Sequence, residues 1–153
     1  MSDAVEFSFR LTGFGWAEGR IAVGGSSATL EASCLESDAL RDLVRAVRAL
    51  LEGAPGARAL WDAEPVAYRW FFQRIGVDVR VRLLEFPDSF SDAPDDVLLN
   101  TTCLVRDLGV AIASGAQTVL DEIGARRYKK RWGHPFPSDD LAALQGLLHS
   151  DPP

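Results

Sequence analysis

Residues 5–34 alternate between apolar and polar side chains in three runs that are separated by glycine-rich turns. The apolar positions that share one face are Val5, Phe7, Phe9 and Leu11, then Ala17, Gly19, Ile21 and Val23, then Ala28, Leu30, Ala32 and Cys34. A period of two is typical of a strand with one buried and one solvated face. The pattern therefore predicts a three-stranded antiparallel meander, with turns at 13–15 and 24–26.

Helical spacing follows the third run. The apolar residues that recur at intervals of three and four are Leu40, Leu43, Val44, Val47, Leu50 and Leu51. Ser37 is the predicted N-cap and Gly53 the predicted stop of this amphipathic helix. Residues 54–65 are rich in Gly, Ala and Pro, so they are predicted to form a loop.

The second half of the chain repeats this order. Alternation predicts strands at 66–73, 77–83 and 97–105, and helical spacing predicts a long helix over 108–124 and a short C-terminal helix over 138–148. The segment Cys34-Leu35 precedes Arg41-Asp42-Leu43, as Cys103-Leu104 precedes Arg106-Asp107-Leu108, which favours a duplicated plan. The predicted fold is α+β in βββα–βββα order: one antiparallel sheet of about six strands, two long helices packed on one face, and the short C-terminal helix.

Composition places the chain among ordinary globular proteins. Its 153 residues, 47% hydrophobic and 25% charged, predict a single domain over residues 1–153. No apolar run approaches the roughly 20 residues of a membrane span, and the acidic N-terminus lacks a secretion-signal pattern. With only two cysteines as well, we expect a cytoplasmic protein, and the Arg- and Ala-rich usage suggests a bacterial source.

Charge is unevenly distributed along the chain. The net charge is −6, yet residues 126–131 hold five basic side chains and no acid. The remaining eleven basic and 22 acidic residues leave a net charge of −11 outside that segment. Nucleic-acid binding requires a broad basic footprint, so this distribution disfavours it.

Catalytic and metal-binding signatures are weak. Cys34 and Cys103 fall on predicted core faces, where cysteine behaves as a small apolar residue. Ser114 lies within a predicted helix rather than in a nucleophile elbow. His134 and His149 have no His or Cys partner at ligand spacing. The sequence predicts no catalytic residue, no metal ligand and no cofactor, and it favours a non-enzymatic role.

An acidic loop and a basic cluster are the strongest candidate sites. The loop carries Glu85, Asp88, Asp92, Asp95 and Asp96 around Phe90. Its favoured interpretation is a solvated turn in which Asp and Ser cap backbone amides; a protein-binding loop and a cation site are the alternatives. The basic cluster, which includes Arg127, Lys130 and Arg131, complements the end of the long helix or pairs with the acidic loop or an acidic partner.

The polar faces of the predicted strands offer a further candidate surface. Their side chains are Arg10, Trp16, Glu18, Arg20, Glu31, Arg69, Phe71, Asp78, Arg80 and Arg82. Cross-strand charge pairs on a solvated face explain most of them. Exposed aromatic rings among arginines also match the composition of protein interfaces, and a homodimer through this face is a third interpretation.

Two segments carry a resemblance to known proteins: residues 85–92 (EFPDSFSD) and residues 131–137 (RWGHPFP). They resemble segments of small uncharacterised bacterial proteins, some of which are similar to immunity proteins of toxin–immunity systems. The resemblance covers less than a fifth of the chain. It implies no catalytic residue, and none is carried over to this chain.

These observations together predict a non-enzymatic protein-binding module, in its narrower form an immunity-type inhibitor that occludes a partner protein. Separated acidic and basic patches suit charge-steered association. The predicted partner-binding residues are Asp88, Phe90, Asp92, Asp95, Asp96, Arg127, Lys130 and Arg131. The alternative is a small-molecule-binding protein or enzyme with a cleft between sheet and helices, lined by Trp61, Asp62, Glu64, Tyr68 and Trp70.

Overall fold

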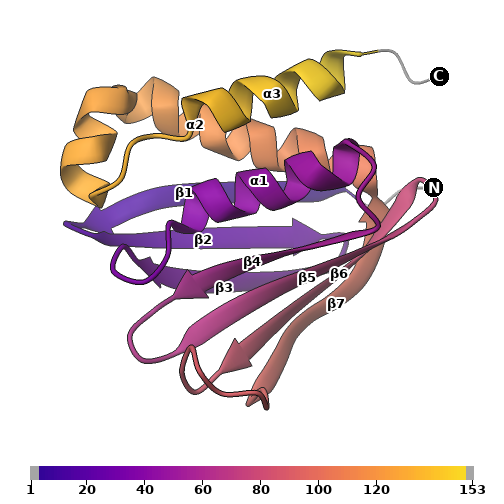
Figure 1. The fold of residues 1–153 in the computed structure, drawn as a ribbon, viewed down its shortest axis with the longest axis horizontal. Helices are drawn as coiled ribbons and strands as arrows, with labels where there is room; N and C mark the ends of the chain where they lie inside the picture. Colours follow the sequence, from indigo (N-terminus) through magenta and orange to yellow (C-terminus); the bar gives the residue numbers. More distant parts are fainter. Residues whose placement is uncertain (1–3, 151–153) are drawn as a thin grey trace.

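A computed structural model describes residues 4–150, which form strands and helices in the order βββα–ββββαα (Figure 1). The elements are β1 (Val5–Gly13), β2 (Trp16–Val23), β3 (Ser26–Ser33), α1 (Ala39–Leu51), β4 (Gly56–Asp62), β5 (Ala67–Ile75), β6 (Asp78–Phe86), β7 (Asp96–Leu104), α2 (Val105–Trp132) and α3 (Ser138–His149). The α+β class and most of the predicted elements are therefore confirmed. No helix in the described range is both long and apolar enough to cross a membrane.

The strands form two antiparallel sheets rather than the predicted single sheet. β1-β2-β3 make one sheet and β4-β5-β6-β7 make the other. In Figure 1 the first sheet runs nearly horizontally behind the second, whose strands run diagonally. The inner faces pack together: a Cβ atom at Gly19 of β2 would lie 2.4 Å from the Trp61 ring of β4. Alternation identified the buried face of the predicted strands, but it does not say what covers that face.

β4 was missed because its first four residues, Gly56 to Ala59, include no β-branched or aromatic side chain. The segment begins Pro55-Gly56-Ala57, and residues 54–65 were predicted to be a loop. In the structure Ala57 lies opposite Phe72, and Trp61 lies opposite Tyr68. α1 packs closely along this strand, so small side chains such as Ala59 are favoured at the contact.

The helices cover the two sheets from one side, α1 over β4 and α2 over β1 (Figure 1). Ser37 is not the N-cap of α1; Asp38 holds that position and makes no side-chain cap bond. Ser37 Oγ instead accepts a hydrogen bond from the backbone N–H of Asp62 at 3.1 Å. Asp38 Oδ1 accepts one from Trp132 Nε1, also at 3.1 Å. Both side chains are used in joining α1 to other parts of the fold.

The long C-terminal helical region contains a break. α2 begins at Val105, and Gly124 interrupts it with a φ of 75°. The predicted helix end near Gly124 is therefore confirmed, but helical structure resumes and continues to Trp132. The predicted C-terminal helix is confirmed as α3.

The core lies between the two sheets and beneath the helices. Its aromatic centre joins Phe9 to Trp61 and to Trp132, with ring centroids 5.7 Å and 6.0 Å apart. Trp61 also contacts Trp70, at 5.5 Å. Because these rings come from β1, β4, β5 and α2, the core ties both sheets to the end of α2.

Candidate partner-binding surface

Loops from distant parts of the sequence lie along one side of the molecule, from the left to the bottom in Figure 1. Hydrogen bonds fix their order in space. The N–H of Gly15 donates to the carbonyl of Arg131 at 2.7 Å, and the N–H of Cys34 donates to the carbonyl of Gly15 at 3.0 Å. Ser89 Oγ donates to Glu36 Oε2 at 2.9 Å. We call this surface the loop end and define it as residues 13–15, 34–37, 87–95 and 126–134.

The acidic loop, residues 85–96, is ordered by its own side chains. Asp88 Oδ1 accepts hydrogen bonds from Phe90 N at 2.9 Å, from Ser91 N at 2.7 Å and from Ser91 Oγ at 2.9 Å. The hydrogen bond from the Ser91 hydroxyl, followed by that from the Phe90 amide, lowers the pKa of Asp88 below its usual value. The predicted capping role of Asp88 is thus confirmed.

The same loop folds back over the outer face of the four-stranded sheet. The Arg69 guanidinium lies 4.0 Å from the centroid of the Phe86 ring, and Arg69 Nη2 donates to the carbonyl of Ser89 at 2.9 Å. Phe86 is 2% exposed, although it lies outside the main core cluster. Buried anchors of this kind hold the loop in place, so its outward side chains have a defined position.

The other acidic side chains of the predicted site point to solvent. Asp96 Oδ1 accepts a hydrogen bond from Val97 N at 2.8 Å. Asp92 and Asp95 are exposed, and their carboxylates make no hydrogen bond or ion pair within residues 4–150. Asp88 and Asp96 therefore stabilise the loop, whereas the carboxylates of Asp92 and Asp95 face solvent.

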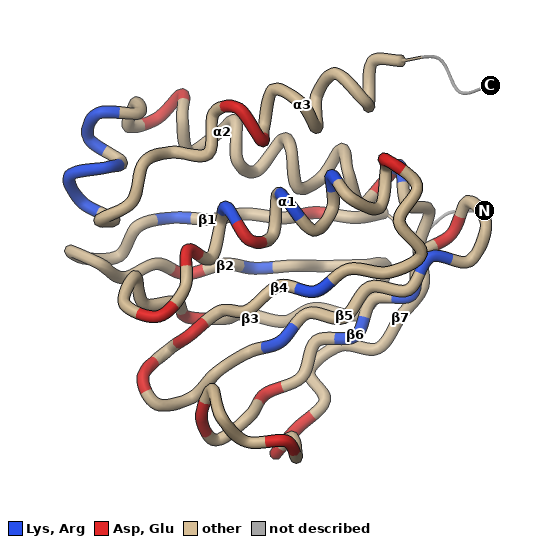
Figure 2. The backbone as a smooth tube through the Cα atoms, in the orientation of Figure 1, with Lys and Arg blue, Asp and Glu red and all other residues tan. Residues whose placement is uncertain are grey.

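The basic cluster, residues 126–131, lies on the helical turns after Gly124. Tyr128 and Trp132 are fully buried. These aromatic rings therefore anchor the turns and are not exposed for stacking with a nucleic-acid base. Arg127 and Lys130 are exposed. Figure 2 places the cluster at the upper left and the acidic loop at the bottom. The two charged segments of the loop end thus lie apart rather than paired with each other.

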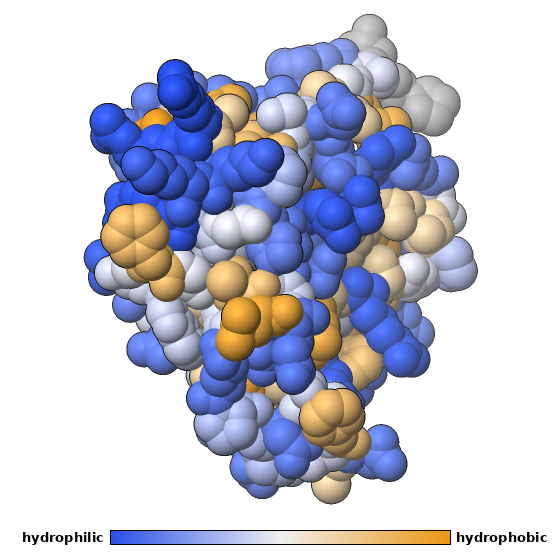
Figure 3. All heavy atoms as spheres, turned by 60° about the vertical axis from the view of Figure 1, so that its left-hand side comes forward, coloured by the Kyte–Doolittle hydropathy of each residue, from blue (hydrophilic) through white to orange (hydrophobic). Residues whose placement is uncertain are grey.

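Three exposed apolar side chains accompany these charges at the loop end. Phe14, Leu35 and Phe90 are 76%, 72% and 85% exposed, each in a different loop. Figure 3 shows this side of the molecule, where separate apolar side chains stand among hydrophilic ones. Phe90 was among the predicted partner-binding residues, whereas Phe14 and Leu35 were not. Their apolar character at turn positions was the signal that could have identified them.

The candidate nucleophiles and ligands do not form a catalytic arrangement. His134 Nε2 lies 2.7 Å from the backbone carbonyl of Cys34, so this ring nitrogen contacts the main chain rather than the thiol. Cys103 is buried. Among the described residues, no group of three His, Cys, Asp or Glu side chains is placed to hold a metal ion.

Of the five residues predicted to line a cleft between sheet and helices, Trp61, Asp62 and Trp70 are buried in the interior, Tyr68 is half-buried and Glu64 is exposed. Trp61 and Trp70 are 0% exposed and belong to the core cluster. Asp62 is 2% exposed, and this burial raises its pKa above the usual value. Its neighbour Glu64 accepts a hydrogen bond from the Ser33 hydroxyl. These side chains join β3 to the end of β4, which is a structural role.

The predicted polar sheet face is divided between the two sheets. On the first sheet Arg10 and Glu18 form an exposed ion pair of 3.2 Å. On the second sheet Phe71 lies among arginines, one of which, Arg58, belongs to the strand that was predicted to be a loop. The cross-strand pairing expected for a solvated face is therefore seen on the first sheet. The second sheet has a different, arginine-rich character.

Fold and surface define an α+β protein with a polarised loop end and an arginine-rich sheet face. Comparisons with protein-family models, with curated proteins and with solved structures found no match to this chain.

Proposed function

We propose that this chain is a non-enzymatic protein-binding module whose loop end contacts the partner. The observation that carries the proposal is the set of Phe14, Leu35 and Phe90, three side chains at least 72% exposed on loops that hydrogen bonds hold side by side. Exposed apolar side chains gain free energy when a partner covers them, and aromatic residues are enriched at the energetic centres of interfaces.

The charged segments of the loop end determine the orientation in which a partner binds. The basic cluster and the acidic loop lie at different places along this side of the molecule, the cluster at the upper left and the loop at the bottom of Figure 2. A partner surface must present the opposite arrangement, because like charges brought together cost several kcal/mol. Asp92 and Asp95 contribute on the acidic side, and Arg127 and Lys130 on the basic side. In its narrower form, the proposal is an immunity-type inhibitor that occludes the active surface of a toxin.

Affinity purification from cells that express the protein natively tests the proposal. We expect the wild-type chain to retain a stoichiometric partner and the Phe90→Ser/Leu35→Ser variant to lose it. Val77→Ser is the matched control: Val77 is 68% exposed, and it lies at the β5–β6 turn, whereas Phe90 follows the opposite end of β6. That control should retain the partner as the wild type does.

Two results would contradict the proposal: no stoichiometric partner in any eluate, or equal recovery with the loop-end variant. For the immunity-type form, the recovered partner is expected to arrest growth when it is expressed alone. Co-expressed wild-type protein should relieve this arrest, and the Phe90→Ser/Leu35→Ser variant should not. Relief by both proteins would place the inhibitory contact outside the loop end.

A further inference from the structure

The outer face of the four-stranded sheet carries an aromatic ring between two arginines. Arg58 of β4 lies opposite Phe71 of β5, and Phe71 lies opposite Arg82 of β6. Residues that face each other across two strands have Cβ atoms about 5 Å apart, so both guanidinium groups reach the ring between them. Their Cζ atoms each lie 5.4 Å from its centroid.

Both guanidinium groups keep their hydrogen-bond donors available. Within residues 4–150, neither Arg58 nor Arg82 makes a hydrogen bond or an ion pair. The neighbouring arginines are engaged: Arg80 Nε donates to Asn100 Oδ1 at 3.1 Å, and Arg69 donates to the carbonyl of Ser89. A guanidinium has five N–H donors in a planar fork that matches carboxylate and phosphate oxygens. The two free arginines are thus suited to an oxyanion.

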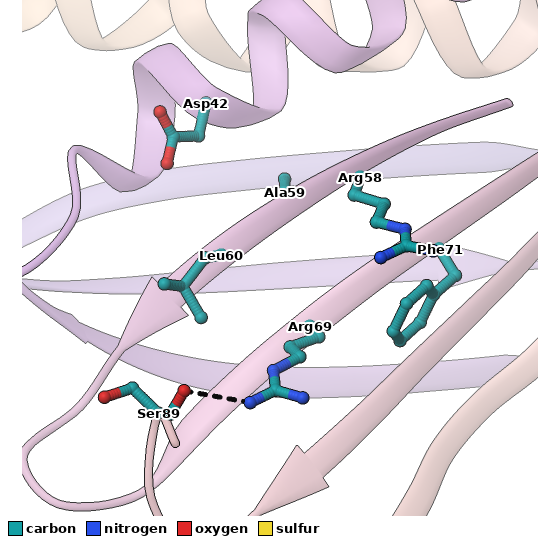
Figure 4. A pocket seen from close by; sticks show the side chains of 7 residues that line it. All are labelled: Asp42, Arg58, Ala59, Leu60, Arg69, Phe71 and Ser89. Carbon is teal, nitrogen blue, oxygen red and sulfur yellow. Dashed lines mark hydrogen bonds between the residues drawn. The ribbon is translucent and has the colours of Figure 1, made fainter. Parts of the chain in front are cut away.

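Two hollows flank the ring and share Arg58 and Phe71. The first, of about 470 Å³, lies toward α1 and the acidic loop, and it includes Leu60 and Arg69 (Figure 4). The second, of about 520 Å³, lies toward the start of β4 and includes Arg82. Volumes of this order suit a small molecule rather than a folded partner. Leu60 and Phe71 offer apolar surface beside the charged groups.

We propose that this face binds a small aromatic molecule that carries a terminal oxyanion, either phosphate or carboxylate. The oxyanion accepts hydrogen bonds from Arg58 and Arg82, and the aromatic body packs against Phe71 and Leu60. Asp42, which lines the α1 side of the first hollow, repels the oxyanion and directs it toward Arg82. This inference is independent of the loop-end proposal, because the residues of the proposed oxyanion site are not those of the loop end.

Isothermal titration of the wild-type chain with phenyl phosphate, with benzoate and with phenol tests the inference. We expect saturable binding of one or both anions, and much weaker binding of phenol. The Arg58→Gln/Arg82→Gln variant should bind the anion at least about tenfold more weakly, because it loses two charge-assisted contacts. Arg80→Gln is the matched control on the same face, since Arg80 is already bonded to Asn100; its affinity should stay within about twofold of wild type.

The relative affinities of phenyl phosphate and benzoate identify the preferred oxyanion. The inference is overturned if neither anion binds, if phenol binds as well as the anions, or if the Arg58→Gln/Arg82→Gln variant retains wild-type affinity. Both substituted side chains are exposed, and a melting curve verifies that the variant is folded. Because the loop-end residues are unchanged, partner recovery by the same variant shows which of the two proposals fails.

Discussion

Substitution of Gly115 by alanine tests the contact between α2 and the first sheet. An added Cβ atom would lie 2.6 Å from Phe7 Cδ2 and 2.7 Å from the Phe7 carbonyl oxygen. Relief of the second contact requires a backbone to move, because the oxygen belongs to the main chain of β1. The helix must therefore lift from the sheet or the strand must shift.

The expected magnitude is the difference of two terms. Overpacking of a core costs about 1–3 kcal/mol, and a clash with backbone belongs at the upper end of that range. Alanine in place of glycine inside a helix recovers about 1 kcal/mol. The net loss is therefore about 2 kcal/mol of unfolding free energy, which for a chain of this length lowers Tm by roughly 4–8 °C.

Gly146→Ala provides the matched control. Gly146 lies in α3, and an added Cβ there would meet no atom of the described part of the chain within 4 Å. Only the helix-propensity term applies, so we expect a gain of about 1 kcal/mol and a Tm rise of roughly 2–4 °C. Urea titrations followed by tryptophan fluorescence measure both variants. If Gly115→Ala were as stable as Gly146→Ala, α2 would not lie against β1 as described.

Two further substitutions test buried polar groups. Among residues 4–150 the buried Tyr128 hydroxyl has no hydrogen-bond partner, so Tyr128→Phe should raise the unfolding free energy by about 1 kcal/mol in the same titrations; a loss of that size would mean that the hydroxyl has a partner. Asp62 Oδ2 is likewise unpartnered, and burial raises the pKa of Asp62 above 3.8. The folded state therefore binds this proton more tightly than the unfolded state, and stability falls as pH rises from 3.8 through the raised value. The unfolding free energy of Asp62→Asn should thus be about 1 kcal/mol higher than that of the wild type at pH 7, and this difference should be lost below pH 3.8. A stability difference that does not change with pH would exclude titration of Asp62 as its source.

The strand pattern was predictable where large side chains alternate, and not elsewhere. Phe7 and Phe9 in β1, or Trp70 and Phe72 in β5, mark a buried face without further information. β4 has Ala57 and Ala59 at the corresponding positions. Only the tertiary contact with α1 makes these small residues favourable in a strand. Local propensity could not have supplied this information.

The candidate surfaces depend even more on long-range contacts. The Asp and Ser residues of the acidic loop predicted a capped turn, and the hydrogen bonds that Asp88 accepts from Ser91 are local in sequence. The placement of Phe14, Leu35 and Phe90 on one side of the molecule required the loops that carry them to lie on the same side of the fold, which no local pattern encodes. Arg58 was likewise missed with its strand, although Arg82 opposite the same ring was recognised as part of a polar face.

Net charge described this protein less well than the placement of its charges. The value of −6 disfavours nucleic acid when a broad basic footprint is required, and two free arginines on one sheet face do not provide such a footprint. At physiological ionic strength, however, interactions between exposed charges are screened beyond about 8 Å. The acids of the distant elements therefore do not prevent Arg58 and Arg82 from binding a single oxyanion. The same screening makes the acidic and basic sides of the loop end act as separate surfaces. A partner that contacts both must therefore match the arrangement of the two charged segments rather than their net charge.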